Sequence, residues 1–465
     1  MAEQMNEQIN EQTGDVKIPK RILNTLLNSL SAGVVPRNGA PYIAIGRQDE
    51  IVSLLDSLQE VYEGGGNCRF VIGRYGSGKS FLIQLIRGYA IERGFICADA
   101  DLSPERRLSG GNGAGRATYR ELMSHLSCKA APDGGALSVI LNKLYATIKE
   151  ELAEQGVTPD DENYVIRVRR RALATMKGID RDVGGYDFSH VIYTYYVALV
   201  NGDEQKMNAC LRWLRGEYST KTEAKTELGF QVGCIIDDSN WYDIIKLFSM
   251  FLMRLGYSGL VVFIDECINL YKIPNRIARE ANYEKILSIF NDTLQGRARF
   301  LGFIFGGTPQ FLEDPRRGLF SYEALRSRLS DSHYEQFGYR TLSTPVIRLR
   351  RLSDNELLAL VRRLTKLYAQ REGTDKLLIS DEQSERFIRE ALARAGATEL
   401  VTPREVIRDY MTLLNILRDN PEVNFDTLMD KMKFTEPGTD EETPAKTEKP
   451  ENGKSNKVDI FDIEI

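Results

Sequence analysis

The stretch from Gly73 to Ser80, Gly-Arg-Tyr-Gly-Ser-Gly-Lys-Ser, constrains the fold of this chain more than any other part of it. It fits G-x-x-x-x-G-K-[ST], the phosphate-binding P-loop. The run Arg69–Ile72 before it predicts a short buried strand, and Phe81–Ala90 after it predicts a helix. In such a strand–loop–helix unit, backbone N–H groups and the positive end of the helix face a phosphate. The sequence therefore predicts a nucleoside triphosphate site on an α/β fold.

The motif also predicts what individual side chains do. Lys79 would reach the β- and γ-phosphates, and the Ser80 hydroxyl would bind Mg²⁺, so the predicted cofactors are ATP and Mg²⁺. The residues predicted to contact the nucleotide here are Gly73, Arg74, Tyr75, Gly76, Ser77, Gly78, Lys79, Ser80 and Phe81.

A second motif follows far along the chain, where the apolar run Leu260–Ile264 ends in Asp265 and Glu266. A continuous apolar run is expected for a central parallel strand, because both of its faces are buried. This is the Walker B pattern: Asp265 would hold Mg²⁺, and Glu266 would act as the general base that activates water.

Another apolar run, Phe300–Gly307, predicts a further buried strand and is followed by Thr308. At that position Thr308 would sense the γ-phosphate or position the attacking water. A threonine that only caps the next helix is the alternative.

The motifs divide the chain into six predicted parts. Residues 1–18 are expected to be disordered, 19–102 and 258–350 to form the two parts of the nucleotide-binding core, and 351–434 to form a small helical lid. Residues 103–257 lack nucleotide motifs and predict a mainly helical insertion. The segment 435–465 is rich in Glu, Lys, Pro and Thr and predicts a disordered acidic tail.

Composition excludes several classes of protein. The six cysteines form no C-x-x-C pair and the three histidines are far apart, so a zinc site and a disulfide framework have no support. The longest apolar region, 244–264, contains Lys246 and Arg254, which argues against a membrane span. We therefore expect a soluble, cytoplasmic protein without membrane contact.

Charge gives only local hints about partners. The segment 436–465 carries nine acidic and four basic residues, which accounts for the entire net charge of −5. The cluster Arg167–Arg171 in the insertion is either a solvated helix face or a nucleic-acid contact. The alternation of apolar and acidic residues in Val458–Ile465 would allow strand addition to a partner, with an unstructured end as the alternative.

Together these motifs resemble AAA+ ATPases of the origin-recognition and helicase-loader group. That resemblance implies a P-loop core with a parallel central sheet, and that the segment around Gly46 and Arg47 packs on the adenine. It also implies an arginine that reaches the nucleotide of a neighbour in a homo-oligomeric ring, for which Arg328 or, less favoured, Arg326 is the candidate. An ordinary surface arginine is the alternative at both positions. Arg404, which begins a helix after Thr402 and Pro403, would be a phosphate-sensing arginine of the lid.

A narrower resemblance is to the P-loop ATPases of BREX phage defence, the BrxD type, related to BrxC. It rests on segments such as Asp101–Leu108, Ala117–Leu122, Leu214–Tyr218 and Asp265–Ile273, and covers roughly residues 20–420. It implies ATP binding and a role in bacterial defence, with a helicase or another protein of the defence operon as partner. The C-terminal tail, through its alternating end, is the candidate contact for that partner.

The chain departs from the origin-recognition pattern after the predicted lid, where too few residues remain for a winged-helix DNA-binding domain. DNA contact would then come from the core, the insertion or a ring pore, with Tyr271–Arg276 as a candidate loop. Two functions stay open: an ATPase motor or loader that acts on DNA or a helicase, and a nucleotide-dependent switch or scaffold with little turnover. A small-molecule phosphotransferase is a third, which the Asp-Glu pair and the predicted lid weaken.

Overall fold

The computed structural model describes residues 17–179, 182–331, 341–394 and 402–431. The disorder predicted for the N-terminus falls almost entirely outside these residues, as does the predicted acidic tail. Among the described residues, no helix combines the length and the apolar character needed to cross a membrane.

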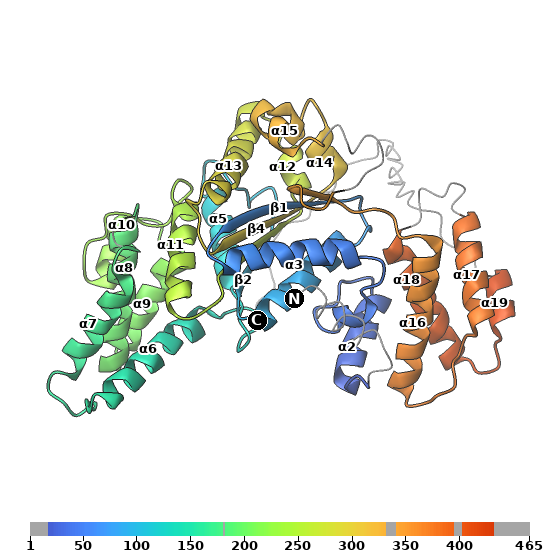
Figure 1. Ribbon diagram of the computed structural model, residues 1–465, viewed down its shortest axis with the longest axis horizontal. Coiled ribbons are helices and arrows are strands. Elements are labelled where there is room, and N and C mark those ends of the chain that lie inside the picture. The colour runs from blue at the N-terminus through green and yellow to red at the C-terminus, as the bar shows by residue number, and fades with distance from the viewer. Residues whose placement is uncertain (1–16, 180–181, 332–340, 395–401, 432–465) are drawn as a thin grey trace, which may run out of the picture.

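A five-stranded parallel sheet forms the centre of the molecule (Figure 1). The strands lie in the order β2-β3-β4-β1-β5. Their bounds are β1 Gly66–Ile72, β2 Ile96–Asp101, β3 Leu260–Asp265, β4 Leu301–Gly307 and β5 Val346–Arg348. The predictions of a parallel sheet and of each buried strand are confirmed. Because the strands are parallel, their carboxyl ends meet at one edge, where Asp101 lies beside Asp265 and Ile72 beside Gly307.

Helices cover both faces of this sheet, as the alternating side chains of buried strands require. On one face, α3 (Gln48–Tyr62) and α4 (Lys79–Glu92) pack on Val71, Val261 and Ile304. On the other, α5 (Ala114–Ser124), α11 (Trp241–Arg254) and α13 (Arg276–Leu294) belong to one core with Phe70, Val262 and Phe305. The short helices α12 (Ile268–Tyr271), α14 (Pro309–Glu313), η3 (Leu319–Ser321) and α15 (Glu323–Leu329) follow β3 and β4.

The middle of the predicted insertion forms a helical arm, which we define as α6–α10 and which extends to the left in Figure 1. Its helices are α6 (Leu137–Glu154), α7 (Tyr164–Met176), α8 (Gly185–Asn201), α9 (Glu204–Leu214) and α10 (Lys221–Leu228). Its apolar side chains continue the core that contains α11 and the sheet. The arm is therefore packed onto the sheet layer rather than attached by a bare linker.

A second helical unit at the right of Figure 1 has a separate apolar core. It contains α16 (Asp354–Glu372), α17 (Asp381–Arg394), α18 (Pro403–Asp419) and α19 (Phe425–Lys431), together with the N-terminal α2 (Lys20–Ser31). Ser353 forms a capping box at the start of α16, and Thr402 forms another at the start of α18. The boundaries between the predicted domains stay predictions. The contacts of this unit show in addition that α2 packs with the C-terminal helices.

Buried polar contacts hold the loop after β2 on α13. The Asn282 side chain accepts hydrogen bonds from the N–H groups of Leu108 and Ser109, both at 2.9 Å, and donates one to the Ser109 carbonyl at 2.8 Å. The Trp241 indole donates to the Leu108 carbonyl at 3.0 Å. Asn282 is fully buried, so water cannot replace it.

We predict that Asn282→Ala lowers the free energy of unfolding by about 2–4 kcal/mol, because two buried N–H groups lose their acceptor. Chemical denaturation monitored by tryptophan fluorescence measures this, since Trp241 contacts the same loop. Glu284→Ala, on the exposed side of the same helix, is the control and should change stability by less than about 0.5 kcal/mol. Equal effects of the two variants would contradict the prediction.

Candidate functional site

The P-loop connects β1 to α4 at the carboxyl edge of the sheet, where the motif predicts it. The Gly73 N–H donates to the Gly307 carbonyl at 3.1 Å, which fixes the start of the loop beside the end of β4. Lys79 is buried, and its Nζ donates to the Arg74 carbonyl at 3.1 Å, inside the loop. Burial lowers the pKa of the Lys79 ammonium. The negative charges of Asp265 and Glu266 oppose this shift, and the positive charge of Arg404 adds to it.

Ser80 and Asp265 meet although they lie far apart in sequence. The Ser80 Oγ donates to Asp265 Oδ2 at 2.7 Å. Gly306 on the neighbouring strand makes room for this carboxylate, because a Cβ at that position would lie 2.3 Å from Asp265 Oδ1. A hydroxyl beside a carboxylate offers the hard oxygen ligands that Mg²⁺ prefers. The two side chains therefore fit the predicted Mg²⁺ site.

No group of three or more His, Cys, Asp or Glu side chains in the described parts of the chain is placed to hold a metal by itself. Mg²⁺ in phosphate-binding sites needs only one or two protein oxygens, since phosphates and water complete its coordination. Ser80 and Asp265 match that pattern, and not the pattern of a metal site made by protein alone.

Glu266 follows Asp265 with an unusual backbone conformation. Its φ is +56°, in the left-handed region that non-glycine residues rarely adopt. Its N–H donates to Asp265 Oδ1 at 2.8 Å, and the residue lines the same pocket as the P-loop. Burial raises the pKa of its carboxyl, and the charge of Asp265 raises it further, while Lys79 opposes both. The strained turn thus presents a carboxyl with increased basicity to the pocket.

A pocket lies beside the P-loop and has two parts. The polar part contains the loop from Tyr75 to Phe81, with Arg47, Glu266 and Arg404. The other part is almost entirely apolar and is lined by Leu30, Val34, Val35, Pro36, Ile43, Ile45, Leu352, Leu360, Pro403 and Ile407. A polar half for phosphates next to an apolar half for a base is the shape that a nucleotide requires.

Sequence reasoning missed most of the apolar half. It comes from α2 and the segment after it, from η1 (Ala40–Ile43), and from α16 and α18, which are distant in sequence. One signal was available: Gly33-Val-Val-Pro36 is an apolar run directly after a helix end, with no strand to explain it. Val34 is 59% exposed and lines the pocket together with Val35 and Pro36.

Arg47 lies in the pocket wall but is mainly a structural link. It is buried and pairs with Glu50, while its guanidinium donates to the Ser77 carbonyl at 2.9 Å and to the Arg350 carbonyl at 2.8 Å. Gly46 does not line the pocket. It packs against α16, where a Cβ would lie 2.7 Å from the Glu356 side chain. Of this predicted pair, the structure brings only Arg47 to the pocket.

The start of α18 contacts the P-loop directly. Arg404 lines the pocket, and its charge acts on Lys79. Thr402, the N-cap of the helix, lies against Gly76, where a Cβ would approach the Thr402 side chain to 2.7 Å. Gly76 has a φ of +72°, so both its conformation and its closeness to Thr402 require glycine. The structure therefore brings Arg404 to the predicted phosphate-binding end.

The remaining predicted residues do not line this pocket. Thr308 is buried and caps α14, accepting a hydrogen bond from the Phe311 N–H at 3.3 Å, as in the alternative interpretation. Arg326 and Arg328 lie exposed on α15, and Arg328 donates to the Ala324 carbonyl at 2.7 Å. Within one protomer neither arginine reaches the pocket, so their predicted role requires a neighbouring subunit.

The candidate loop 271–276 is only partly open to solvent. The Tyr271 hydroxyl donates to Asp314 at 3.2 Å, and the Arg317 guanidinium lies over its ring. Arg276 is exposed and pairs with Glu280. Because Arg317 covers one face of the ring and Asp314 holds its hydroxyl, Tyr271 is poorly placed to stack on a nucleobase.

Two comparisons with known proteins bear on the chain. No curated protein matches its sequence. The family model described as BREX system ATP-binding protein BrxC/D matches residues 18–433, which span both helical units and the sheet. The match covers most of the chain, and its ATP-binding description agrees with the two-part pocket at the P-loop. The chain belongs to the family of BREX system ATP-binding proteins BrxC/D.

Proposed function

We propose that this protein hydrolyses ATP with Mg²⁺ as a cofactor, in the manner of an AAA+ ATPase, and acts in bacterial defence against phage. The observation that carries the proposal is the convergence of Lys79, Ser80, Asp265, Glu266 and Arg404 around one pocket with an apolar half. The sheet order β2-β3-β4-β1-β5, with a helical unit beside the P-loop, supports the AAA+ assignment and the interpretation of α16–α19 as a lid.

The chemistry follows from where these groups lie. The adenine would occupy the apolar half, and the phosphates would replace the Arg74 carbonyl as partners of the Lys79 ammonium. Ser80 and Asp265 would hold Mg²⁺, which supplies charge neutralisation on the phosphate oxygens. Glu266 would accept a proton from the attacking water, and its raised pKa makes it a stronger base than an ordinary carboxylate. Arg404 would add positive charge near the γ-phosphate.

The finer proposal is that hydrolysis drives action on DNA or the loading of a helicase partner by a homo-oligomer. Family membership in a multi-protein defence system and the exposed Arg326 and Arg328 support it. The alternative is a switch or scaffold with little turnover. Steady-state hydrolysis measured with and without DNA separates the two, because only a motor or loader should turn over faster with DNA.

We predict that Lys79→Ala weakens ATP binding at least about tenfold, because a charged hydrogen bond to the phosphates is lost. Titration with a fluorescent ATP analogue measures the dissociation constant. Lys366→Ala, at an exposed position of α16, is the matched control and should bind normally. Unchanged affinity of Lys79→Ala would refute the P-loop assignment.

We predict that Glu266→Gln keeps ATP binding but lowers the rate of hydrolysis about 100-fold or more, because the amide cannot accept a proton. In the unmodified protein, the raised pKa of Glu266 predicts that kcat falls on acidification at a pH above the ordinary carboxyl range. Phosphate release in single-turnover and steady-state assays measures both effects. A variant with normal turnover would show that Glu266 is not the base.

We predict that Val34→Asp weakens ATP binding about tenfold, because a carboxylate at the pocket mouth opposes both the apolar base and the negative phosphates. Val34 is largely exposed, so the substitution should not affect folding. Val34→Leu keeps the apolar surface and is the control. If both variants bind ATP equally well, the base does not occupy the apolar half.

A further inference from the structure

Helix α7 presents three arginines on its exposed side. Arg167, Arg169 and Arg170 are all exposed, and none has a carboxylate partner among the residues that the structure describes. On the same side lie the exposed Ile166 and Leu173, whereas Val168 and Ala172 of this helix are buried in the arm. The three guanidiniums therefore form a basic surface that no carboxylate of the described residues neutralises.

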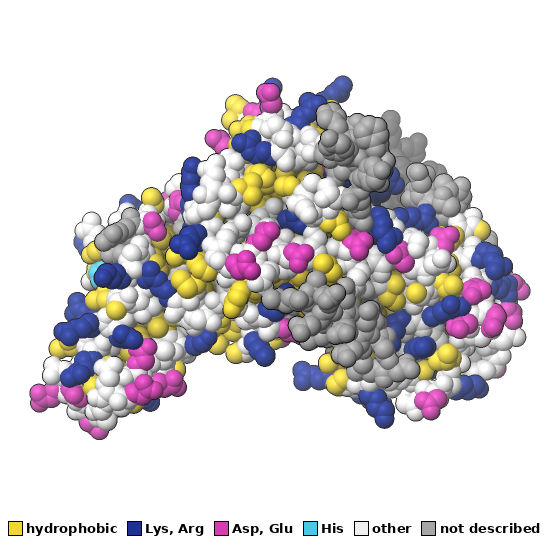
Figure 2. Space-filling view, in the orientation of Figure 1, with side chains coloured by type: hydrophobic (Ala, Val, Ile, Leu, Met, Phe, Trp, Pro, Cys, Tyr) yellow, Lys and Arg dark blue, Asp and Glu magenta, His cyan; other side chains and the backbone are white. Residues whose placement is uncertain are grey.

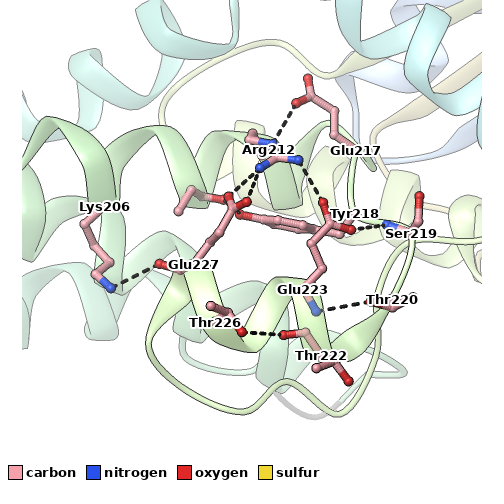
Figure 3. Close-up of polar contacts among 11 residues, drawn as sticks. Lys206, Arg212, Glu217, Tyr218, Ser219, Thr220, Thr222, Glu223, Thr226 and Glu227 are labelled. Carbon is pink, nitrogen blue, oxygen red and sulfur yellow. Dashed lines mark hydrogen bonds and ion pairs between the residues drawn. The ribbon is translucent and has the colours of Figure 1, made fainter.

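Other arginines of the arm behave differently. Arg171, next in the chain, pairs with Glu151 of α6. Arg212 of α9 contacts Glu217, Glu223 and Glu227, and its guanidinium lies over the Tyr218 ring (Figure 3). Carboxylates of the arm thus neutralise both Arg171 and Arg212. The lack of partners at 167, 169 and 170 is a local property of this face.

Aromatic side chains extend the basic surface from α7 onto α8. The Arg169 guanidinium lies over the Tyr193 ring at 4.7 Å, Tyr193 stacks on His190, and His190 stacks on Phe230 with ring centroids 4.0 Å apart. Tyr186 meets the edge of His190 and is 68% exposed. His190 Nδ1 is enclosed and has no hydrogen-bond partner among the described groups. The stack is ordered within the protein, and Tyr186 offers an open ring at its end.

The carboxylates near this surface lie at its border or are already used. Asp187 of α8 is buried and accepts hydrogen bonds from the Gly233 and Cys234 N–H groups at 3.0 and 2.8 Å. Asp160 and Glu162 are exposed in the loop before α7, and Asp182 is exposed just before α8. Figure 2 shows Lys and Arg side chains along the arm over α7 and α8, with carboxylates grouped toward its lower end. The middle of the α7–α8 face is therefore positive.

We infer that this α7–α8 face binds single-stranded nucleic acid, with Arg167, Arg169 and Arg170 on the phosphates and Tyr186 stacked on a base. Exposed guanidiniums without carboxylate partners suit a phosphate chain, and the exposed Tyr186 ring at the end of the aromatic row on α8 suits an unpaired base. A duplex would use the arginines but leave the tyrosine without a partner, since paired bases present no open face. The inference deepens the proposed action on nucleic acid and names its contact surface.

The test measures binding of a fluorescently labelled 25-nucleotide oligothymidine to the full-length protein by anisotropy at several salt concentrations. For the combined variant Arg167→Ala, Arg169→Ala and Arg170→Ala, the slope of log affinity against log salt should become shallower by about 2, because each lost phosphate contact contributes about 0.7 for a single strand. Tyr186→Ala should weaken binding about tenfold, and Tyr186→Phe should restore it because the ring remains.

A matched triple variant in the C-terminal unit, Lys366→Ala, Lys376→Ala and Arg389→Ala, removes the same charge from another exposed surface and should bind the oligonucleotide normally. Binding of the ATP analogue is measured in every variant and should not change, which separates this inference from the ATP site. The inference is overturned if the α7 variant keeps the wild-type salt slope, or if the wild-type protein binds no oligonucleotide while it still binds ATP. It is also overturned if duplex DNA or an acidic peptide binds this face and the oligonucleotide does not.

Discussion

The candidate site depends on one buried guanidinium, that of Arg47. It joins three parts of the chain that are far apart in sequence: the start of α3 through Glu50, the P-loop through the Ser77 carbonyl, and the segment before α16 through the Arg350 carbonyl. A buried cation is costly unless its donors are satisfied, so this geometry holds only when all three parts are in place. The P-loop and the C-terminal helices are thereby kept next to each other, which closes the pocket between them.

Sequence reasoning was most successful where a function needs residues close together in the chain. The P-loop, the Asp265-Glu266 pair and the strands β1, β3 and β4 were predictable because each is a local pattern with a strict physical requirement. The meeting of Ser80 and Asp265 also followed, since parallel strands end at one edge of a sheet. The small size of Gly306, which admits the Asp265 carboxylate, became apparent only when the neighbouring strand was known.

The apolar half of the pocket was not predictable in the same way. Val34, Ile45, Leu360 and Ile407 come from separate helices and loops, and no spacing in the sequence relates them. The packing of α2 with α16 and α18 brings them together, and that packing depends on a tertiary core rather than on a motif. For the same reason, Gly46 and Arg47 were assigned to nucleotide contact, although the glycine packs on α16 and the arginine mainly links backbone segments.

The contact between Gly76 and Thr402 has a mechanical consequence. Gly76 of the P-loop packs directly against the Thr402 side chain at the start of α18, where a Cβ would lie 2.7 Å away. Any outward movement of the loop around Gly76 must therefore displace the beginning of α18. Because α18 shares an apolar core with α16 and α2, that displacement would also act on the packing of the C-terminal unit. The P-loop and the C-terminal unit are thus in direct contact, and the absence of a side chain at Gly76 is what allows this contact to be so close.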